Sequence, residues 1–450
     1  MHMLGGTAAQ IAERLYAAGH EVYLVGGAVR DRLLGVEPHD IDLATTALPE
    51  QVLELFPGGK DDGAEFGRVL IEGVDVLTLR EDGEYKDARR PSRVVYTTDI
   101  VKDLARRDFT INAMAMRYPD GVLIDPFGGE TDILLKTVRA VGDATVRFLE
   151  DALRLMRAVR FAGTLGFGID EFTRWSMQDC AHTLSRIAPE RIRDELSRML
   201  VGEYAHFGLG LMEPLGLLEG VIPELQAAVG CEQRCPNHRL DVWGHTLAVV
   251  NNIQPVLHLR LAALLHDVGK PATKQTRSEG RDTFYNHEHV GGDMAREILE
   301  RLRYPNDITE KVVRLVDNHM FHFDKRTTPG AVRRLIVRVG PENVDDLLEL
   351  RRADHAGART AAFPQGRSYT MLHEIAEQMR TESHAITVKD LALNGYDVMY
   401  FWNLRPGPLV GVILECCLNY VLDDPSRNTR EVLTAFIDDQ MKQEGTYGLG

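Results

Sequence analysis

The sequence lacks any apolar run close to the roughly 20 residues that a helix needs to cross a bilayer. Its first residues, MHMLGGTAAQ, do not combine a basic region with an apolar core, as a secretory signal would. Cysteine is scarce: five residues are unevenly spread over 450 positions, which argues against a disulfide framework and fits a reducing compartment. We therefore expect a cytoplasmic protein with no membrane partner.

Positive charge is in deficit. The chain has 52 Lys and Arg against 67 Asp and Glu, a net charge of −15, which argues against a protein that coats nucleic acid without specificity. The segment 311–338 reverses this balance, with a net charge of +5. Such runs are most often solvated surfaces. The alternative is a contact with an RNA backbone, made through Lys311, Arg314, Lys325, Arg326, Arg333, Arg334 and Arg338, among which lie Asp317 and Asp324.

A length of 450 residues is too great for one compact core and predicts about three domains. Alternating patterns fill about the first 130 residues, with strands expected at 22–25, 40–44, 68–71, 74–79 and 122–124 and helices at 7–18, 28–34 and 49–56. From about Arg147 onward, helical periods dominate. The predicted fold class is α+β, with a small α/β head over 1–146 followed by helical regions over 147–230, 231–340 and 341–450.

The turn-rich segment CEQRCPNH, residues 231–238, predicts a linker between two of these regions. Cys231, Cys235 and His238 within it could bind zinc. One cysteine pair without a second pair is a weak signal, so the plain linker is favoured.

Two aspartates, Asp40 and Asp42, lie two residues apart in a predicted strand, so both side chains project from one face. Adjacent carboxylates repel each other unless a cation neutralises them, and Mg²⁺ accepts such oxygen ligands together with substrate phosphates. Two metals held in this way can activate an attacking hydroxyl and stabilise a leaving pyrophosphate. Taken alone, such a pair is most often a surface turn whose aspartates cap the following helix.

The segment before the aspartates favours the catalytic reading. Gly26 and Gly27 follow an apolar strand and open a helix, where bare backbone can approach a triphosphate closely. Arg30 lies on the next turn and could pair with a phosphate oxygen. Asp75 interrupts the apolar strand VDVLTLR (74–80) and is the best candidate for a third metal-binding carboxylate. An aspartate on an edge strand facing water is the alternative.

A row of charged residues, Asp151, Arg154, Arg157 and Arg160, recurs every three residues in a predicted helix over 150–163. Each step advances about 300° around the helix, so neighbours face each other while the row drifts until Arg160 lies opposite Asp151. Asp151 and Arg154 therefore form the best pair to read a base. A carboxylate accepts from an exocyclic amine and a guanidinium donates to ring acceptors, and cytosine and adenine offer both. The alternative is an ion-paired surface helix.

GGAVRD (26–31) and HDIDLA (39–44) closely resemble the class II tRNA nucleotidyltransferases, which comprise the CCA-adding enzymes and their bacterial poly(A) polymerase relatives. Further motifs of that family follow in order as RRDFTINAMA (106–115), DPFGG (125–129), EDALRLMRAVRFAGTLGF (150–167) and APERIRDELSRML (188–200). The resemblance covers roughly residues 20–225 with no motif missing. It implies a polymerase-β-like head and a helical neck.

The resemblance also implies roles for single residues. Asp40 and Asp42 would hold Mg²⁺, Arg107 would bind the triphosphate, and Asp151 and Arg154 would select CTP or ATP, supported by Arg157 and Arg160. Asp108 and Asn112, four apart and expected on one helix face, more plausibly brace the site than react. The polar segment 80–94 occupies the place of a loop that the family needs to add the terminal A, which argues against a CC-only enzyme.

A second constellation resembles the HD phosphohydrolase superfamily: His245, then LLHDVGK (264–270) with His266 and Asp267, and Asp354 in RRADHAG (351–357). His287, His289 and His319 are further candidate ligands. Imidazoles and a carboxylate from separate helices suit a divalent transition metal. In relatives that carry this domain it acts as a phosphatase or cyclic phosphodiesterase, and the resemblance implies the same activity here. The alternative is an HD fold with a degraded site.

We therefore expect an enzyme that adds CMP and AMP from CTP and ATP to the 3′ end of tRNA by a two-metal mechanism. The region 341–450, which includes TVKDLALNGYDVM (387–399), resembles the body and tail of bacterial family members and would help to bind tRNA. Three alternatives stay open: an enzyme restricted to A addition, an HD metallophosphohydrolase whose N-terminal half binds RNA, and a non-catalytic RNA-binding module. The oligomeric state is left open.

Overall fold

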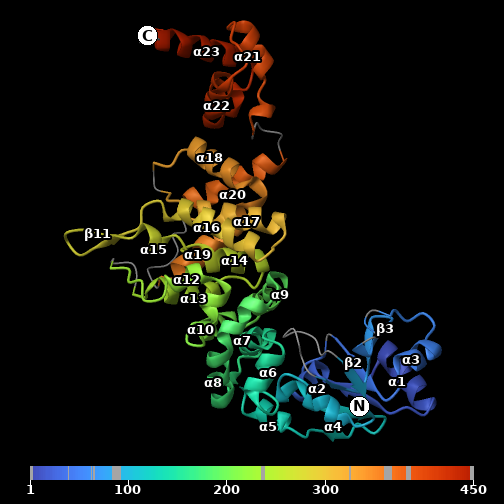
Figure 1. Ribbon diagram of the computed structural model, residues 1–450. Helices are drawn as coiled ribbons and strands as arrows, with labels where there is room; N and C mark the ends of the chain where they lie inside the picture. Colours follow the sequence, from blue (N-terminus) through green and yellow to red (C-terminus); the bar gives the residue numbers. More distant parts are fainter. Residues whose placement is uncertain are drawn as a thin grey trace. The chain divides into compact units, whose positions relative to one another are not determined.

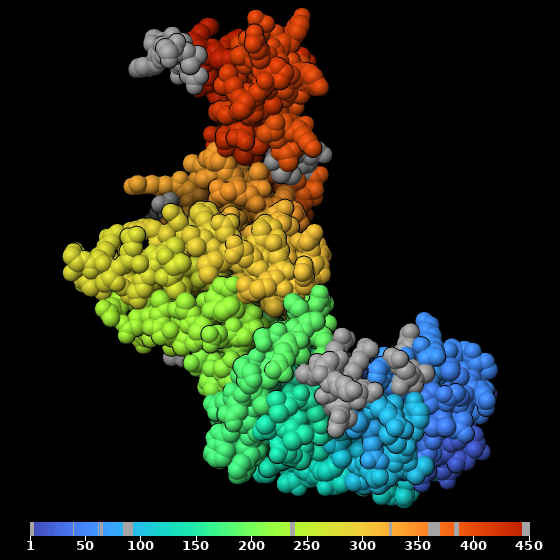
Figure 2. Space-filling view, viewed as in Figure 1, coloured from blue at the N-terminus to red at the C-terminus, as the bar shows by residue number. Residues whose placement is uncertain are grey.

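The computed structural model describes residues 4–38, 40–61, 63, 66–83, 93–234, 239–323, 326–358, 367–381 and 387–445. The chain forms two compact units, Met1–Gln226 and Ala227–Gly450. They can be followed by colour, the first from blue to green and the second from green to red (Figures 1 and 2). The expected division into four regions stays a prediction.

The first unit contains a six-stranded sheet with the order β3–β4–β2–β1–β7–β8. Its strands are β1 (Val22–Val25), β2 (Asp42–Thr45), β3 (Arg68–Ile71), β4 (Val74–Thr78), β7 (Ala115–Tyr118) and β8 (Leu123–Ile124). Only β2 and β4 pair in parallel, and in their register Asp42 lies opposite Asp75. The strand expected from residue 40 begins two residues later, so Asp40 precedes it.

The helices α1 (Gly6–Ala17), α2 (Gly27–Leu33) and α3 (Pro49–Leu55) contact strands of this sheet, and α4 (Ile100–Ala105) and α5 (Gly129–Leu134) lie in the same part of the chain (Figure 1). Helix α3 begins with a proline, which has no amide hydrogen that would lack an intrahelical partner. Helix α4 is capped by Asp99, whose side chain accepts a hydrogen bond from a backbone amide of the first turn. Ile100 and Leu104 of α4 join the buried cluster beneath the sheet together with Tyr23 and Val25. A separate ribbon consists of β5 (Arg80–Asp82) and β6 (Val94–Tyr96).

A helical region completes the first unit. Its helices are α6 (Ala144–Glu150), α7 (Leu153–Leu165), α8 (Glu171–Cys180), α9 (Pro189–Leu200), α10 (Ala205–Met212), α11 (Leu217–Val221) and α12 (Pro223–Gln226). Between α5 and α8, the two-residue strands β9 (Thr137–Val138) and β10 (Gly168–Ile169) pair in parallel. The predicted α+β fold class is confirmed.

The helix expected across residues 150–163 is interrupted, which corrects the sequence interpretation. Asp151 adopts extended backbone angles (φ −145°, ψ 103°), and its carboxylate accepts a hydrogen bond from the Leu153 amide at 3.1 Å. A short acidic side chain that binds a backbone amide competes with helix continuation, so α6 ends and α7 begins at this point. Asp151 and Arg154 therefore do not share one continuous helical face.

The second unit is almost entirely helical. Its longer helices are α13 (Val242–Asn252), α14 (Leu257–Leu265), α16 (His287–Arg301), α17 (Asn306–Asn318), α18 (Pro329–Val339), α19 (Val344–Gly357), α20 (Arg367–Thr381), α21 (Gly395–Phe401), α22 (Pro408–Asp423) and α23 (Arg430–Gly445). After the short helix α15 (Lys270–Thr273), a hairpin that the sequence patterns did not predict pairs β11 (Gln275–Thr276) with β12 (Asp282–Thr283). Among the described residues, no helix has the length and apolar character of a membrane span.

The packing of α7 against α9 and α10 depends on two glycines. A Cβ built on Gly208 would lie 2.7 Å from the Val159 carbonyl oxygen and 2.8 Å from the Gly163 Cα. We predict that Gly208→Ala forces these helices apart, costs about 1–3 kcal/mol and lowers the midpoint of thermal unfolding.

Gly411→Ala is the matched control. Gly411 also lies within a helix, but nothing approaches its Cβ position within 4 Å, so alanine should be neutral or stabilise by up to about 1 kcal/mol. An unfolding midpoint of Gly208→Ala equal to that of the wild type would contradict close packing at this crossing.

Candidate active site

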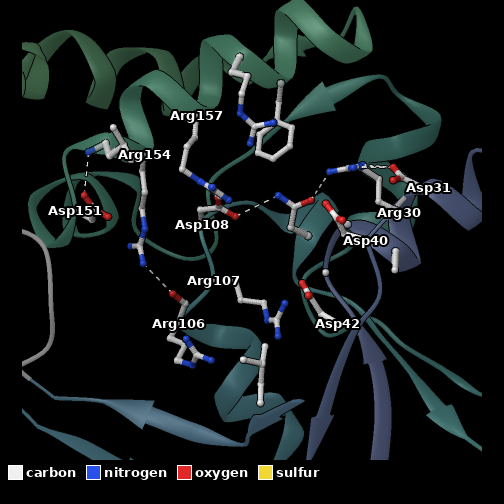
Figure 3. Close-up of a pocket in the computed structure, with 18 of the residues that line it drawn as sticks. Arg30, Asp31, Asp40, Asp42, Arg106, Arg107, Asp108, Asp151, Arg154 and Arg157 are labelled. Carbon is white, nitrogen blue, oxygen red and sulfur yellow. Dashed lines mark hydrogen bonds and ion pairs between the residues drawn. The ribbon is translucent and has the colours of Figure 1, made fainter. Parts of the chain in front are cut away.

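One cleft in the first unit gathers most of the predicted site residues (Figure 3). It has a volume of about 630 Å³. The predicted residues that line it are Gly26, Gly27, Arg30, Asp40, Asp42, Arg107, Asp108, Asn112, Asp151, Arg154, Arg157 and Arg160. Asp40 and Asp42 lie on one side of the view, and Asp151 and Arg154 on the other (Figure 3).

The glycine turn after β1 allows side chains to pack closely on the acidic side of the cleft. Gly26 has φ +69°, which L side chains rarely adopt. A Cβ at this position would meet a terminal nitrogen of Arg107 at 3.0 Å and a carboxylate oxygen of Asp42 at 3.9 Å. The bare backbone therefore lets a cationic and an anionic side chain lie close beside it.

Asp42 lies in a concentration of negative charge. Burial raises the pKa of its carboxyl, the charges of Asp75 and Asp40 raise it further, and Arg107 opposes them. Within the described residues, neither Asp40 nor Asp42 has a side-chain hydrogen bond or ion pair. Oxygen ligands that repel one another and lack protein partners fit a hard divalent cation.

Asp75 is near this pair but is not among the residues that line the cleft. Its carboxylate pairs with the Nε of Arg68 at 2.8 Å, across the antiparallel β3–β4 hairpin. The sequence interpretation had Asp75 facing a ligand. The structure gives it an arginine partner, and its role as a third metal ligand stays a prediction.

Arg107 reaches the cleft from the segment after α4. One terminal nitrogen pairs with the buried Asp103 at 3.1 Å. Its Nε is buried and has no hydrogen-bond partner among the described residues. A buried cationic donor without a partner is costly and is suited to an anionic ligand.

A chain of polar contacts runs from Arg30 of α2 to Arg157 of α7 (Figure 3). Arg30 pairs with Asp31 at 2.7 Å and donates to the Asn112 amide oxygen at 2.7 Å. Asn112 in turn donates to Asp108 at 3.3 Å, and Asp108 pairs with Arg157 of α7. Burial alone would raise the pKa of Asp108, but the guanidinium groups of Arg157 and Arg154 outweigh it and hold that pKa at about 2. Asp108 and Asn112 thus brace the site through side-chain contacts with arginines.

The two predicted base-reading residues are held separately. Arg154 is 9% exposed, pairs with Glu150 at 2.7 Å and donates to the carbonyls of Arg147 and Arg106 at 3.0 Å each. The carboxylate of Asp151 instead accepts hydrogen bonds from both terminal nitrogens of Arg191, at 2.9 and 3.3 Å. Both side chains still line the same cleft.

Sequence reasoning overlooked the partners that fix these arginines and aspartates. Glu150 directly precedes Asp151, and Arg191 and Glu195 lie on α9 within a segment already singled out as a motif. Arg160 pairs with Glu195, and its guanidinium lies 3.9 Å from the centroid of the Phe161 ring. The arginine-rich motif APERIRDEL was a signal that could have identified Arg191.

A second cluster of chemically capable residues lies in the second unit. It consists of His245 on α13, His266 and Asp267 after α14, His287 at the start of α16, His319 after α17 and Asp354 on α19. Two buried groups within it, His245–His266–Asp267 and Asp267–His287–His319, each bring their ligand atoms within 4.8 Å of one another. His245 Nε2 lies 3.0 Å from Asp354 and 3.5 Å from Asp267. His289 is not part of the cluster, because its ring is 63% exposed and pairs with Asp317.

Backbone carbonyls orient three of these rings. The Nδ1 atoms of His266, His287 and His319 donate to the carbonyls of Ala263, Phe284 and Val316 at 2.8, 2.8 and 2.7 Å. Their Nε2 atoms point to the carboxylate of Asp267 at 3.1, 3.4 and 3.8 Å. Burial lowers the pKa of His319 to about 3, and the neighbouring His266 and His287 add to this shift, so its ring is neutral. A neutral Nε2 facing a carboxylate suits a shared cation.

The basic segment 311–338 does not form one continuous cationic surface. Lys311 pairs with Asp346 at 2.7 Å, Arg334 pairs with Asp423 at 2.8 Å, and Arg314 lies 3.9 Å from Glu342. Arg333 donates to the Leu422 carbonyl at 3.1 Å. Much of the charge in this segment is therefore neutralised locally.

Some expectations fall outside the described residues. These are His39 of the aspartate motif, most of the segment 80–94, Cys235 and His238 of the weak zinc motif, and Asp324 and Lys325 of the basic segment.

Comparisons with known proteins match three parts of the chain. Residues 22–139 match a poly(A) polymerase head domain, 166–229 match the "Probable RNA and SrmB- binding site of polymerase A", and 237–359 match an HD domain. The CCA-adding enzyme of Lactiplantibacillus plantarum is 33% identical over 432 residues, which cover 95% of this chain and 94% of that protein. The chain belongs to the CCA-adding enzyme family.

Other family members match over part or all of their length. The CCA-adding enzyme of Leuconostoc citreum is 42% identical over 53% of this chain and 61% of that protein, and that of a Geobacillus strain is 44% identical over 52% and 60%. These two alignments thus span about three-fifths of the relatives' length. The structure of the Bacillus stearothermophilus CCA-adding enzyme in complex with CTP has a TM-score of 0.71 and 28% identity, covering 98% of both chains. Nucleotidyltransferases of this family depend on a divalent metal, and the described residues include groups able to bind one.

Proposed function

We propose that this protein adds CMP and AMP, from CTP and ATP, to the 3′ end of tRNA in the cytoplasm. The observation that carries the proposal is that one cleft combines the Asp40–Asp42 pair, the glycine turn beside Arg107, and the Asp151–Arg154 pair. Membership of the CCA-adding enzyme family supports the same activity. The head over 1–146 would hold the reacting groups, 147–230 would select the nucleotide, and 231–340 and 341–450 would carry the HD site and help to bind tRNA.

Asp40 and Asp42, with Asp75 nearby, would hold divalent cations, which we take to be Mg²⁺. Bound there, these ions would lower the barrier to attack by the 3′-hydroxyl and to loss of pyrophosphate. Arg107, with its unpartnered Nε, would bind the triphosphate, and the backbone of Gly26 and Gly27 leaves room for the phosphates.

Asp151 and Arg154 would read the base. The Asp151 carboxylate accepts from the exocyclic amine of cytosine or adenine, and Arg154 donates to a ring acceptor. Uracil and guanine present other patterns at these positions. Because Glu150 and two carbonyls hold Arg154, and Arg191 holds Asp151, the donors and acceptors are oriented before the nucleotide arrives. Arg157 and Arg160 would support the nucleotide from α7.

Enzymes restricted to A addition are the closest alternative. The decisive assay uses two tRNA transcripts, one lacking CCA and one ending in CC, with CTP and ATP supplied separately and together. We expect CTP to extend the first transcript, ATP to extend the second, and the mixture to complete the first. Failure to incorporate CMP, with AMP incorporation intact, would assign the protein to A addition alone.

In this assay, we predict that Asp42→Asn loses on the order of a thousandfold in rate, because a neutral amide supplies less of the charge that holds the cations. Asp293→Asn, an exposed aspartate of α16, makes the same chemical change away from the cleft and should keep the wild-type rate. Wild-type incorporation by Asp42→Asn would refute the catalytic assignment.

A second prediction concerns base choice. We expect Asp151→Ala to reduce the preference for CTP and ATP over UTP and GTP by roughly five- to a hundredfold, because one base contact is lost. Arg191→Ala should reduce it less, because the carboxylate remains but loses the partner that orients it.

The control for base choice is Arg193→Ala on the same helix, whose guanidinium pairs with Asp194 instead. The measurement is kcat/KM for each of the four nucleotides with one tRNA substrate. An unchanged preference in Asp151→Ala would rule out base reading by this residue.

A second candidate activity is supported by the histidine cluster of the HD region. We infer that His245, His266, Asp267 and Asp354 bind a divalent transition metal. His287 and His319, whose Nε2 atoms face the Oδ1 atom of Asp267, would be additional ligands. Such a metal would supply Lewis-acid activation of a phosphoester and of water. A metallophosphohydrolase with an RNA-binding N-terminal half, and no nucleotide addition, is the alternative reading of the whole chain.

We predict that His266→Ala lowers the metal content of protein loaded with Mn²⁺ or Ni²⁺ and then dialysed, as measured by mass spectrometry of the metal. His289→Ala, which changes an exposed histidine outside the cluster, should retain the wild-type content. Equal contents in both variants would disprove the site. Hydrolysis of p-nitrophenyl phosphate by the loaded wild type, absent in His266→Ala, would add phosphohydrolase activity, and its absence in both would leave metal binding alone.

A further inference from the structure

A second cleft, in the second unit, is lined in part by arginines of the basic segment 311–338. It lies between the segment after His319 and helix α18, and has a volume of about 410 Å³ (Figure 1 labels α18). The described residues that line it are Met320, Phe321, His322, Phe323, Arg326, Thr327, Thr328, Ala331, Arg334, Leu335 and Arg338. Its size lies within the range of pockets that enclose a small organic ligand.

The charge of this cleft is opposite to that of the chain. Three arginines line it, Arg326, Arg334 and Arg338, and none of the described lining residues is acidic, in a protein with a net charge of −15. A cleft with this excess of guanidinium groups favours an anionic ligand.

Two of these arginines, Arg334 and Arg338, are each anchored through one contact with the described residues. Arg334 pairs with Asp423 through one terminal nitrogen at 2.8 Å, and the Nε of Arg338 donates to the Asn318 amide oxygen at 3.2 Å. A guanidinium carries five N–H donors, so one contact of this kind leaves donors for an oxyanion. Arg338 and Arg326 are both solvent-exposed at the cleft.

One wall of the cleft is aromatic. The rings of Phe321 and Phe323 lie with their centroids 5.1 Å apart at an angle of 54°. Phe321 is 7% exposed, and the guanidinium of Arg351 lies 6.0 Å from its ring centroid and also donates to the sulfur of Met320 at 3.6 Å. The wall is thus backed by a fixed cation, while Phe323 remains partly exposed to the cleft.

We propose that this cleft binds a nucleoside phosphate. Its base would stack on Phe323, and its phosphate would be bound by Arg326 and Arg338. An aromatic wall and a guanidinium cluster a few residues apart match the two halves of such a ligand, a planar base and an oxyanion. An isolated inorganic anion would leave the aromatic wall unused. The ligand is either a free mononucleotide or a nucleotide within an RNA strand, which share this chemistry.

The experiment locates binding by photochemistry, because the first unit is also expected to bind nucleotides. The full chain is irradiated with 8-azidoadenosine 5′-monophosphate, digested, and the modified peptides are quantified by mass spectrometry. We expect modification of a peptide from 320–338 in addition to any in the head. Phe323→Ala and Arg326→Glu should each reduce that modification by roughly five- to a hundredfold, without changing modification of the head.

Arg277→Glu is the matched control, because Arg277 is an exposed arginine of the same unit, contacts Tyr285 and lies outside the cleft. It should leave modification of 320–338 within about twofold of the wild type. Absence of modification in the wild type, or equal modification in the wild type and in both cleft variants, would overturn the proposal.

Competition identifies the source of the ligand. AMP should suppress modification of 320–338 at lower concentration than either adenosine or inorganic phosphate, because only AMP has both halves. If a short RNA competes at lower concentration than AMP, the ligand is part of a strand, and if AMP competes as well or better, it is a free nucleotide. Competition by phosphate as strong as that by AMP would refute the aromatic contact. Failure of nucleotide addition to tRNA would not bear on this result, because the modified peptide lies in the other unit.

Discussion

The parallel pairing of β2 with β4 is the constraint on which the candidate active site depends. It sets Asp42 opposite Asp75 in the sheet, with Asp40 just before the strand. Burial and these neighbouring charges raise the pKa of Asp42, which means that the ionised site is unfavourable by itself. The fold thus maintains a local repulsion that cations can relieve, and the glycine turn at Gly26 leaves space beside it. Functional sites often keep such locally unfavourable arrangements.

On the arginine side of the cleft, in contrast, the charged side chains are paired with one another. Arg157 pairs with Asp108, Arg160 with Glu195, and Arg154 has three acceptors. A buried polar network that is satisfied by its own members holds side chains in one geometry. Base selection requires such fixed donors and acceptors. Glu150 and Arg191, which orient Arg154 and Asp151, are therefore the positioning residues on which the proposed base selection would depend.

Much of this site could be predicted because its residues lie in short local patterns. Gly26, Asp40 and Asp42 are close in sequence, and the strand before Gly26 is a short, continuous apolar run. The break at Asp151 could not be read in this way, because an aspartate inside a helical pattern shows its capping role only through the direction of its side chain. The pairing of Asp151 with Arg191 joins residues 40 positions apart and depends on how α9 packs.

The histidine cluster shows the same limit. His287 and His289 are two positions apart on one helix, about 200° around its axis, so only one of them can face inward. The sequence contains both as equal candidates. His287 is inside because its Nδ1 binds the Phe284 carbonyl at the start of α16, whereas His289 reaches Asp317 at the surface. The choice is made by tertiary packing, which residue spacing does not encode.

Net charge and local charge act at different ranges in this protein. The chain carries a net charge of −15, yet some of its acidic residues are paired with fixed cations, as in Lys311–Asp346 and Arg334–Asp423. At physiological ionic strength, repulsion between exposed charges is screened beyond about 8–10 Å. A polyanion near the surface therefore responds chiefly to the charges it touches. A cleft lined by exposed arginines can therefore bind a nucleotide or RNA in an acidic protein, because affinity depends on the charges that lie next to the phosphate.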